Sequence, residues 1–138
     1  MTDLSITASS VKWTGGVPPK LVKAGATITR GQTVYRDTSD NEYKLGDCDA
    51  DATSEIAGIA LTDGYDGSDM LIGLPGSQIN IGATTVAGTG YWQTGTAGGI
   101  GATGEATPTS GDYRVLLFIG SGTGVVTLVL AKGATVIP

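Results

Sequence analysis

Short apolar stretches separated by turn residues run through the chain, and none has the length and 3.6-residue period of an amphipathic helix. Runs rich in Val, Leu, Ile and Tyr predict strands, and the clearest of them cover 33–36, 56–61, 70–74, 114–119 and 125–131. About ten to twelve short strands at this spacing are typical of all-β domains. We therefore expect an antiparallel β-sandwich or barrel, jelly-roll-like in its organisation.

The strand and turn signals of residues 24–76 return at a constant offset of 57 residues. The triplet Gly-Ala-Thr occupies 25–27 and again 82–84, and Gly31 is matched by Gly88. Matching turns and strand cores without a gap indicate a diverged tandem duplication, with pseudo-repeats at about 22–78 and 79–138. The alternative is that any all-β chain with regular turn spacing aligns with itself somewhere.

The first residues differ in pattern from the rest. Apolar and polar side chains alternate over 4–8 and again over 11–13, which predicts extended backbone. Gly15-Gly16 and Pro18-Pro19 then interrupt the pattern, because proline cannot donate to a strand ladder and glycine weakens one. We expect an extended N-terminal arm over 1–19, separable from a single β domain over 20–138, with Trp13 either at its tip or filling the core.

Composition fits one ordinary domain. The chain has 138 residues, of which 40% are hydrophobic, 15% are charged and 23 are glycine. It is too apolar for a disordered tail, and many tight turns would account for the glycines. One cysteine, Cys48, cannot form an internal disulfide, which fits folding in a reducing compartment. We expect neither a membrane-spanning segment nor a secretion leader.

Charge divides the chain sharply. Residues 1–36 hold five Lys or Arg and one Asp, a balance of +4, whereas residues 37–69 hold ten carboxylates and one Lys, a balance of −9. The whole chain carries −5. Sequence-independent DNA binding needs a basic footprint that neutralises phosphates, so we expect no direct nucleic-acid partner. The basic N-terminal end suits an acidic protein surface.

Catalytic signatures are missing. The chain has no histidine, which removes Ser-His-Asp and Cys-His catalysis and the commonest metal ligand. Cys48 lies among Asp47, Asp49 and Asp51, whose negative charges disfavour a reactive thiolate. We therefore expect no enzyme.

Two strings resemble ligand-binding motifs only in part. Asp47-x-Asp49-x-Asp51 is similar to the start of a calcium loop, but Ala52 stands where glycine is needed and Gly58 where a bidentate glutamate is needed. The glycine spacing over 99–104 matches a dinucleotide fingerprint by letters alone, because no strand pattern precedes it and no helix pattern follows. We expect no metal and no cofactor, and interpret 97–110 as a surface excursion.

Several turn and strand elements together resemble a known family. The chain over about 20–135 resembles the tailed-phage capsid cement or head decoration proteins of the DUF2190 family. The best-matching elements are Gly31-Gln32-Thr33-Val34-Tyr35 and Gly58-Ile59-Ala60-Leu61. The resemblance implies a structural virion protein on the outer surface of an icosahedral head, where it bridges major capsid subunits and stabilises the shell against the pressure of packaged DNA.

The implied partners are the major capsid protein and neighbouring copies in a dimer or trimer, with no membrane partner and with folding in the host cytoplasm before assembly. The candidate capsid-binding residues come from the basic N-terminal end: Lys12, Trp13, Val17, Pro18, Lys20 and Lys23. Two alternatives stay open: another virion module, such as a tail or fibre component, and a glycan-binding domain. In the latter, Tyr65, Tyr91 and Trp92 would stack on sugar rings.

Overall fold

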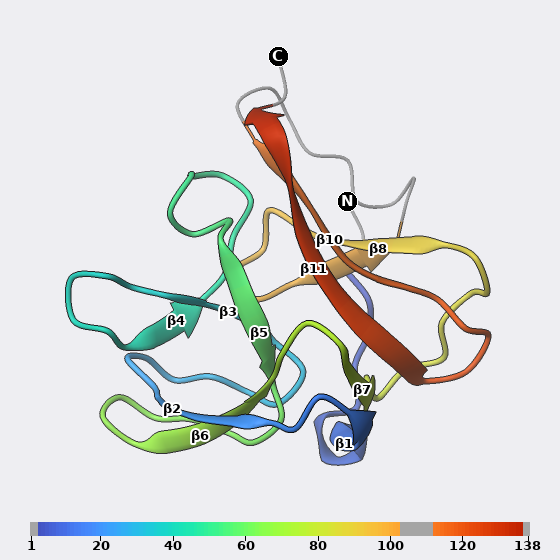
Figure 1. Cartoon of the computed structure of the whole chain (residues 1–138), viewed down its shortest axis with the longest axis horizontal. Coiled ribbons are helices and arrows are strands. Elements are labelled where there is room, and N and C mark those ends of the chain that lie inside the picture. Colours follow the sequence, from blue (N-terminus) through green and yellow to red (C-terminus); the bar gives the residue numbers. More distant parts are fainter. Residues whose placement is uncertain (1–2, 103–111, 137–138) are drawn as a thin grey trace.

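Two antiparallel sheets pack face to face in the computed structural model, which describes residues 3–102 and 112–136 (Figure 1). The five-stranded sheet has the order β2-β6-β5-β3-β4, and the six-stranded sheet has the order β1-β7-β11-β10-β8-β9. The first contains β2 (Lys20–Lys23), β3 (Thr33–Arg36), β4 (Tyr43–Leu45), β5 (Ile56–Ala60) and β6 (Asp69–Gly73). The second contains β1 (Lys12–Gly16), β7 (Ser77–Asn80), β8 (Gly90–Gln93), β9 (Ile100–Ala102), β10 (Tyr113–Ile119) and β11 (Val125–Val136). The prediction of an all-β sandwich is confirmed, and the sheets do not close into a barrel.

Helix contributes almost nothing to the described part of the chain. It is confined there to one 3-10 turn, Ala8–Ser10, which precedes β1. Within the same residues, no helix has the length and apolar character needed to cross a membrane.

The two sheets share one strand order. β7, β8, β9 and β10 each begin 57 residues after β2, β3, β4 and β5, and β11 begins one residue short of that offset from β6. With β1 set aside, the order β7-β11-β10-β8-β9 repeats the order β2-β6-β5-β3-β4 strand for strand. The register of one hairpin recurs too, since Val34 pairs with Leu45 and Tyr91 pairs with Ala102. The offset in the sequence is thus an offset between two sheets of one topology, as a duplication would produce.

Each repeat packs around its own apolar cluster. The cluster of the first repeat consists of Val22, Ala24, Ile28, Val34, Tyr43, Ala60, Met70 and Ile72. The larger cluster lies mainly in the second repeat and consists of Val11, Ile56, Ile59, Leu61, Ile79, Ile81, Tyr91, Ile100, Val115, Leu117, Phe118, Val126 and Leu128. β5 contributes side chains to both clusters, because Ile59 and Ala60 point to opposite sides of the strand. This strand therefore joins the two halves of the core.

The N-terminal segment belongs to the sandwich, so the expectation of a separable arm over 1–19 needs correction. β1 pairs antiparallel with β7, and Thr7 N donates to Gly82 O at 2.8 Å. Val11 is fully buried in the larger cluster, and the partly buried Ile6 packs against that cluster. The apolar positions that predicted extended backbone are core positions, and burial holds the segment down. Glycine and proline at 15–19 turn the chain from one sheet to the other.

One buried polar side chain joins the repeats. Gln93 Oε1 of β8 accepts a hydrogen bond from Thr33 Oγ1 of β3, and Gln93 Nε2 donates to Gly46 O at 3.2 Å and Thr94 O at 3.0 Å. Gln93 and Thr33 are almost completely buried. These bonds satisfy polar groups that would otherwise be costly inside the sandwich, and they link strands of different repeats.

Some predicted elements differ from the structure. The predicted excursion at 97–110 begins with a strand, because 100–102 forms β9 on the edge of the six-stranded sheet, and residues 103–110 lie outside the described residues. The segment 84–87, predicted as a strand, has no strand partner. β9 is the counterpart of β4 at the offset of 57, so the repeat itself contained the signal for this strand.

Candidate docking surface

β1 presents an exposed, open edge, because only β7 pairs with it. Trp13 keeps 42% of its surface exposed, and its Nε1 donates to Val17 O at 3.0 Å. Thr14 Oγ1 donates to Gln78 O at 3.0 Å on β7. Of the two interpretations of Trp13, the core plug is therefore wrong: the indole lies on the surface, held over its own turn.

The corner between β1 and β2 is fixed by close backbone packing. Gly16 has a φ of 71°, and a Cβ there would lie 2.4 Å from Gly76 O, so only glycine fits. Val17 N donates to Gly76 O at 3.2 Å, and Ser77 Oγ donates to Val17 O at 2.7 Å. Val17 and Pro18 are thereby held on the surface, which pre-organises the corner for contact with another molecule.

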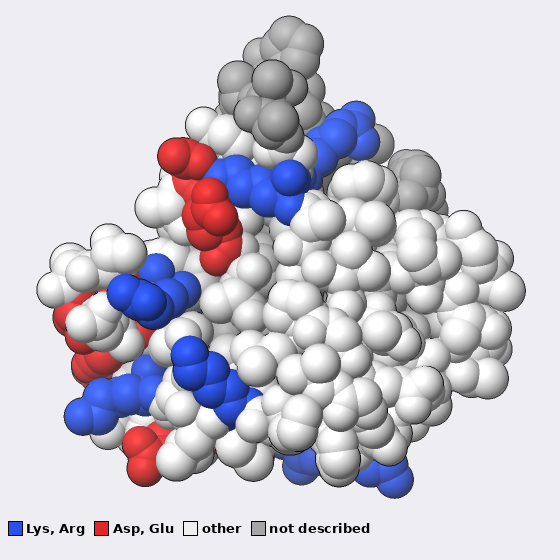
Figure 2. Space-filling view, in the orientation of Figure 1, with Lys and Arg blue, Asp and Glu red and all other residues white. Residues whose placement is uncertain are grey.

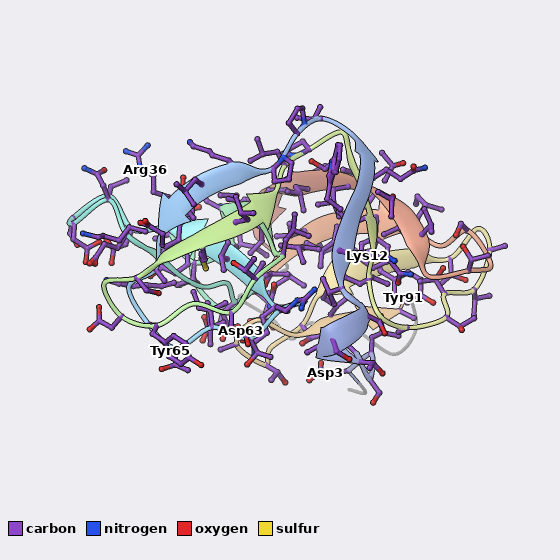
Figure 3. All side chains as sticks on the ribbon, turned by 90° about the horizontal axis from the view of Figure 1, so that it is seen from below. Asp3, Lys12, Arg36, Asp63, Tyr65 and Tyr91 are labelled. Atoms are coloured by element: carbon purple, nitrogen blue, oxygen red, sulfur yellow. The ribbon has the colours of Figure 1, made fainter. Side chains whose placement is uncertain are left out.

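β2 continues the exposed surface on the edge of the other sheet. Lys20, Leu21 and Lys23 are exposed, with 63% of Leu21 accessible, while Val22 is buried. β6 is the strand that pairs with β2, so the opposite edge of β2 is open. Figure 3 shows β1 and β2 on the same side of the molecule, with Lys12 on β1. All six candidate residues predicted from the sequence are exposed, and they lie on one continuous piece of chain that carries two open sheet edges. We call the residues Lys12–Lys23 the corner surface.

The corner lysines are free of ion pairs. Among the described residues, salt bridges involve two other lysines: Lys44 contacts Asp37 and Asp40 at 2.7 and 3.0 Å, and Lys132 contacts Asp51 and Glu55. Figure 2 shows charged side chains gathered over the five-stranded sheet, whereas the opposite side of this face is almost uncharged. The positive charge of the corner surface is available to a partner.

The hairpin of β3 and β4 keeps part of the acidic stretch neutralised. Lys44 Nζ donates to the Asp37 carboxylate, and Ser39 N donates to the same group at 2.9 Å. These bonds hold the pKa of Asp37 well below its usual value and raise the pKa of Lys44. Asp40, which accepts from Glu42 N and from Lys44, also has a lowered pKa. Both carboxylates stay ionised and occupied by their own hairpin.

Arg36 is a surface cation that the sequence reasoning did not assign to the docking surface. It ends β3, is exposed, and lines the same groove as Lys20 and Lys23. Arg36 is 13 residues or more away from both lysines along the chain, so sequence proximity gives no sign of the contact. Only the return of the β3–β4 hairpin to β2, marked by a bridge between Ala24 and Tyr43, brings the three cations together.

The residues considered for chemistry are not arranged as a reactive site. Cys48 is fully buried, and burial, followed by the charges of Asp112 and Asp47, raises the pKa of its thiol to about 12. Burial also raises the pKa of Asp47. In the described part of the chain, no group of three or more His, Cys, Asp or Glu is placed to hold a metal ion.

The three aromatic residues considered for glycan stacking are not gathered. Tyr91 is buried and stacks on Phe118, with ring centroids 5.1 Å apart. Trp92 lies under the Arg114 guanidinium at 5.9 Å, and Tyr65 is exposed by itself on the turn before β6. The geometry provides no aromatic platform from these residues.

Comparison with known proteins adds no relative. No family model matches the chain, and neither the curated proteins nor the solved structures contain a match.

Proposed function

We propose that this protein is a capsid cement protein, a structural virion protein that binds the outer surface of an icosahedral phage head and bridges major capsid subunits. The observation that carries the proposal is the corner surface. It combines unpaired lysines, an exposed Trp13 and two open sheet edges on a rigid turn. Aromatic anchors within a polar rim are typical of protein interfaces, and open edges accept strands. The family resemblance of residues 20–135 supports the same function.

The mechanism is one of differential affinity. Packaged DNA pushes outward on the shell, and a ligand that binds two subunits only at their mature spacing stabilises that state. Binding at a free concentration of 100 times Kd contributes about 2.7 kcal/mol for each site. Many copies act in parallel on one shell, so a modest affinity for each copy is sufficient. Such a ligand needs a rigid body, which the two-sheet sandwich supplies, and it needs no active site.

The proposed partners are the major capsid protein and neighbouring copies of this chain, at the outer head surface after folding in the host cytoplasm. The overall charge of −5 opposes binding to DNA. It also orients the molecule on an acidic shell, because the acidic residues 37–69 would be repelled from it while the corner surface would be attracted.

The test is occupancy on purified heads that lack the protein. Trp13→Ala removes the aromatic anchor and Lys12→Glu reverses an unpaired charge, and each should lower occupancy at limiting concentration by about tenfold. Asp49→Asn, an exposed change in the acidic loop, is the matched control and should leave occupancy unchanged. Equal losses for the corner and the loop variants would show that the docking face is wrong. Electron cryomicroscopy that locates the protein in the tail would overturn the head assignment.

A further inference from the structure

A groove follows the open edge of β2, on the side away from β6. β2 and the β3–β4 hairpin meet at one point, where Gly25 N donates to Tyr43 O at 2.8 Å next to the parallel bridge. Along β2 from this point, a groove of about 300 Å³ separates the two elements. Its lining includes Lys20, Leu21, Lys23, Arg36, Asn41 and Tyr43. In the described part of the chain, β6 supplies the one ladder of β2, so the backbone facing the groove has no strand partner.

The second repeat shows what fills the equivalent place. β7 (77–80) is the counterpart of β2 (20–23), and its corresponding edge carries β1 as an added antiparallel strand. The N-terminal segment continues past it: Thr7 N donates to Gly82 O, and Leu4 N donates to Ile100 O at 2.5 Å. Gly82 and Ile100 are the counterparts of Gly25 and Tyr43 at the offset of 57. The protein's own chain therefore occupies in one repeat the position that is an open groove in the other.

The two positions differ in charge. The groove of the first repeat carries Lys20, Lys23 and Arg36, and none of the three forms an ion pair with a described residue. Their counterparts in the second repeat are the uncharged residues Ser77, Asn80 and Gln93. Asp69 is the cross-strand neighbour of Lys23, but the two make no salt bridge. The open groove is thus a strand-pairing site that has cations where the filled one has neutral side chains.

We propose that the open edge of β2 accepts an extended acidic segment of another protein, which adds an antiparallel strand there as β1 does on β7. Backbone bonds to β2 would supply binding energy, and carboxylates placed against Lys20, Lys23 and Arg36 would supply specificity. That the partner is a head protein rests on the proposed function. The acidic strand chemistry of the site rests on the groove and the repeat.

Other occupants fit less well. The N-terminal segment of a second copy carries Lys12 in β1, which would meet the cations of the groove. A duplex nucleic acid would bring its phosphates to a molecule with a net charge of −5, and the strand edge would contribute nothing to its recognition. An acidic extended peptide uses both the open backbone and the charge.

The experiment is a titration of the isotopically labelled full chain with a synthetic peptide, followed by amide NMR shifts. The residues opposite Lys20 and Lys23 lie three apart on an added strand, so the probe is Thr-Glu-Val-Thr-Glu-Val-Thr, and the control has Gln in place of both Glu residues. We expect shifts centred on β2 and slowed hydrogen exchange of its groove-facing amides. Arg36→Glu and Lys23→Glu should each weaken binding by about tenfold, and Lys12→Glu, an unpaired cation outside the groove, by less than about twofold.

Several outcomes would overturn the inference. Equal affinity for the Gln peptide, shifts centred on β1 or β9, or unchanged affinity in Arg36→Glu with a native melting temperature would each contradict it. Preferential binding of a DNA duplex that depends on Arg36 would assign the groove to nucleic acid, and self-association abolished by Arg36→Glu would assign it to a second copy. Peptide binding is measured without particles, so loss of the peptide site with retained head occupancy would refute this inference and leave the proposed function standing.

Discussion

Val11 tests whether the N-terminal segment belongs to the core. Its side chain is fully buried in the larger apolar cluster, although it precedes the body predicted to begin at residue 20. Ideal Cβ positions built on Gly31 and Gly82 would lie 3.2 and 3.1 Å from Val11 Cγ2, so both repeats approach it closely. We predict that Val11→Ala destabilises the whole sandwich, because the segment that carries Val11 packs between the repeats.

The magnitude follows from the atoms removed. Val11→Ala deletes two methyl groups, worth about 1.6 kcal/mol at 0.8 kcal/mol for each buried carbon. The close backbone of the two glycines cannot move in freely, so a cavity remains and adds to the loss. We expect a total of about 2 to 3 kcal/mol in the free energy of unfolding. A separable arm would predict no change, because a side chain outside the body contributes nothing to its stability.

Urea unfolding followed by tryptophan fluorescence measures this difference. With an m-value of about 2 kcal/mol/M, the loss corresponds to a shift of about 1 M in the unfolding midpoint. Val86→Ala makes the same chemical change at a side chain that is 64% exposed, and it should cost less than about 0.5 kcal/mol. An unchanged m-value would show that both variants unfold as the native protein does.

Equal midpoints for Val11→Ala and Val86→Ala would refute the packing argument. Removal of residues 1–16 is a second test, because it uncovers the site of Val11 and the edge of β7 together. We expect a lower midpoint for the truncated chain than for Val11→Ala. A truncated chain as stable as the full one would restore the separable arm.

Three further predictions concern other parts of the molecule. Gly82→Ala should cost about 3 kcal/mol, since φ is 77° and a Cβ would lie 2.5 Å from a backbone oxygen, whereas Gly67→Ala, with φ of 85° in open space, should cost about 1 kcal/mol in the same urea assay. Cys48 should resist iodoacetamide at neutral pH in the native protein and react once urea exposes it, and rapid native labelling would contradict its burial. The lowered pKa of Asp37 implies stability that is present above about pH 4 and lost as pH falls through its folded value, so Lys44→Met should reduce the drop in urea midpoint on acidification.

The strand content and the repeat could be predicted from the sequence because both are local. Short apolar runs bounded by glycine determine where strands begin and end, and ten of the eleven described strands lie at or beside a predicted run. β9 was missed because a three-residue strand, Ile-Gly-Ala, has too little apolar pattern to be distinguished from a glycine-rich loop. The offset of 57 was visible because turns that need a positive φ select glycine, as Gly31 and Gly88 do.

The candidate site depended more on tertiary structure. The sequence by itself determined that residues 12–23 are basic and broken by glycine and proline, and the structure places all six predicted residues on the surface. It could not determine that Val11 is core, because an alternating pattern shows which side chains want burial but not which surface receives them. Nor could it bring Arg36 to Lys20 and Lys23. That contact depends on the fold of the first repeat, in which one bridge joins β2 to the hairpin and leaves a groove, while the N-terminal strand closes the equivalent edge of the second.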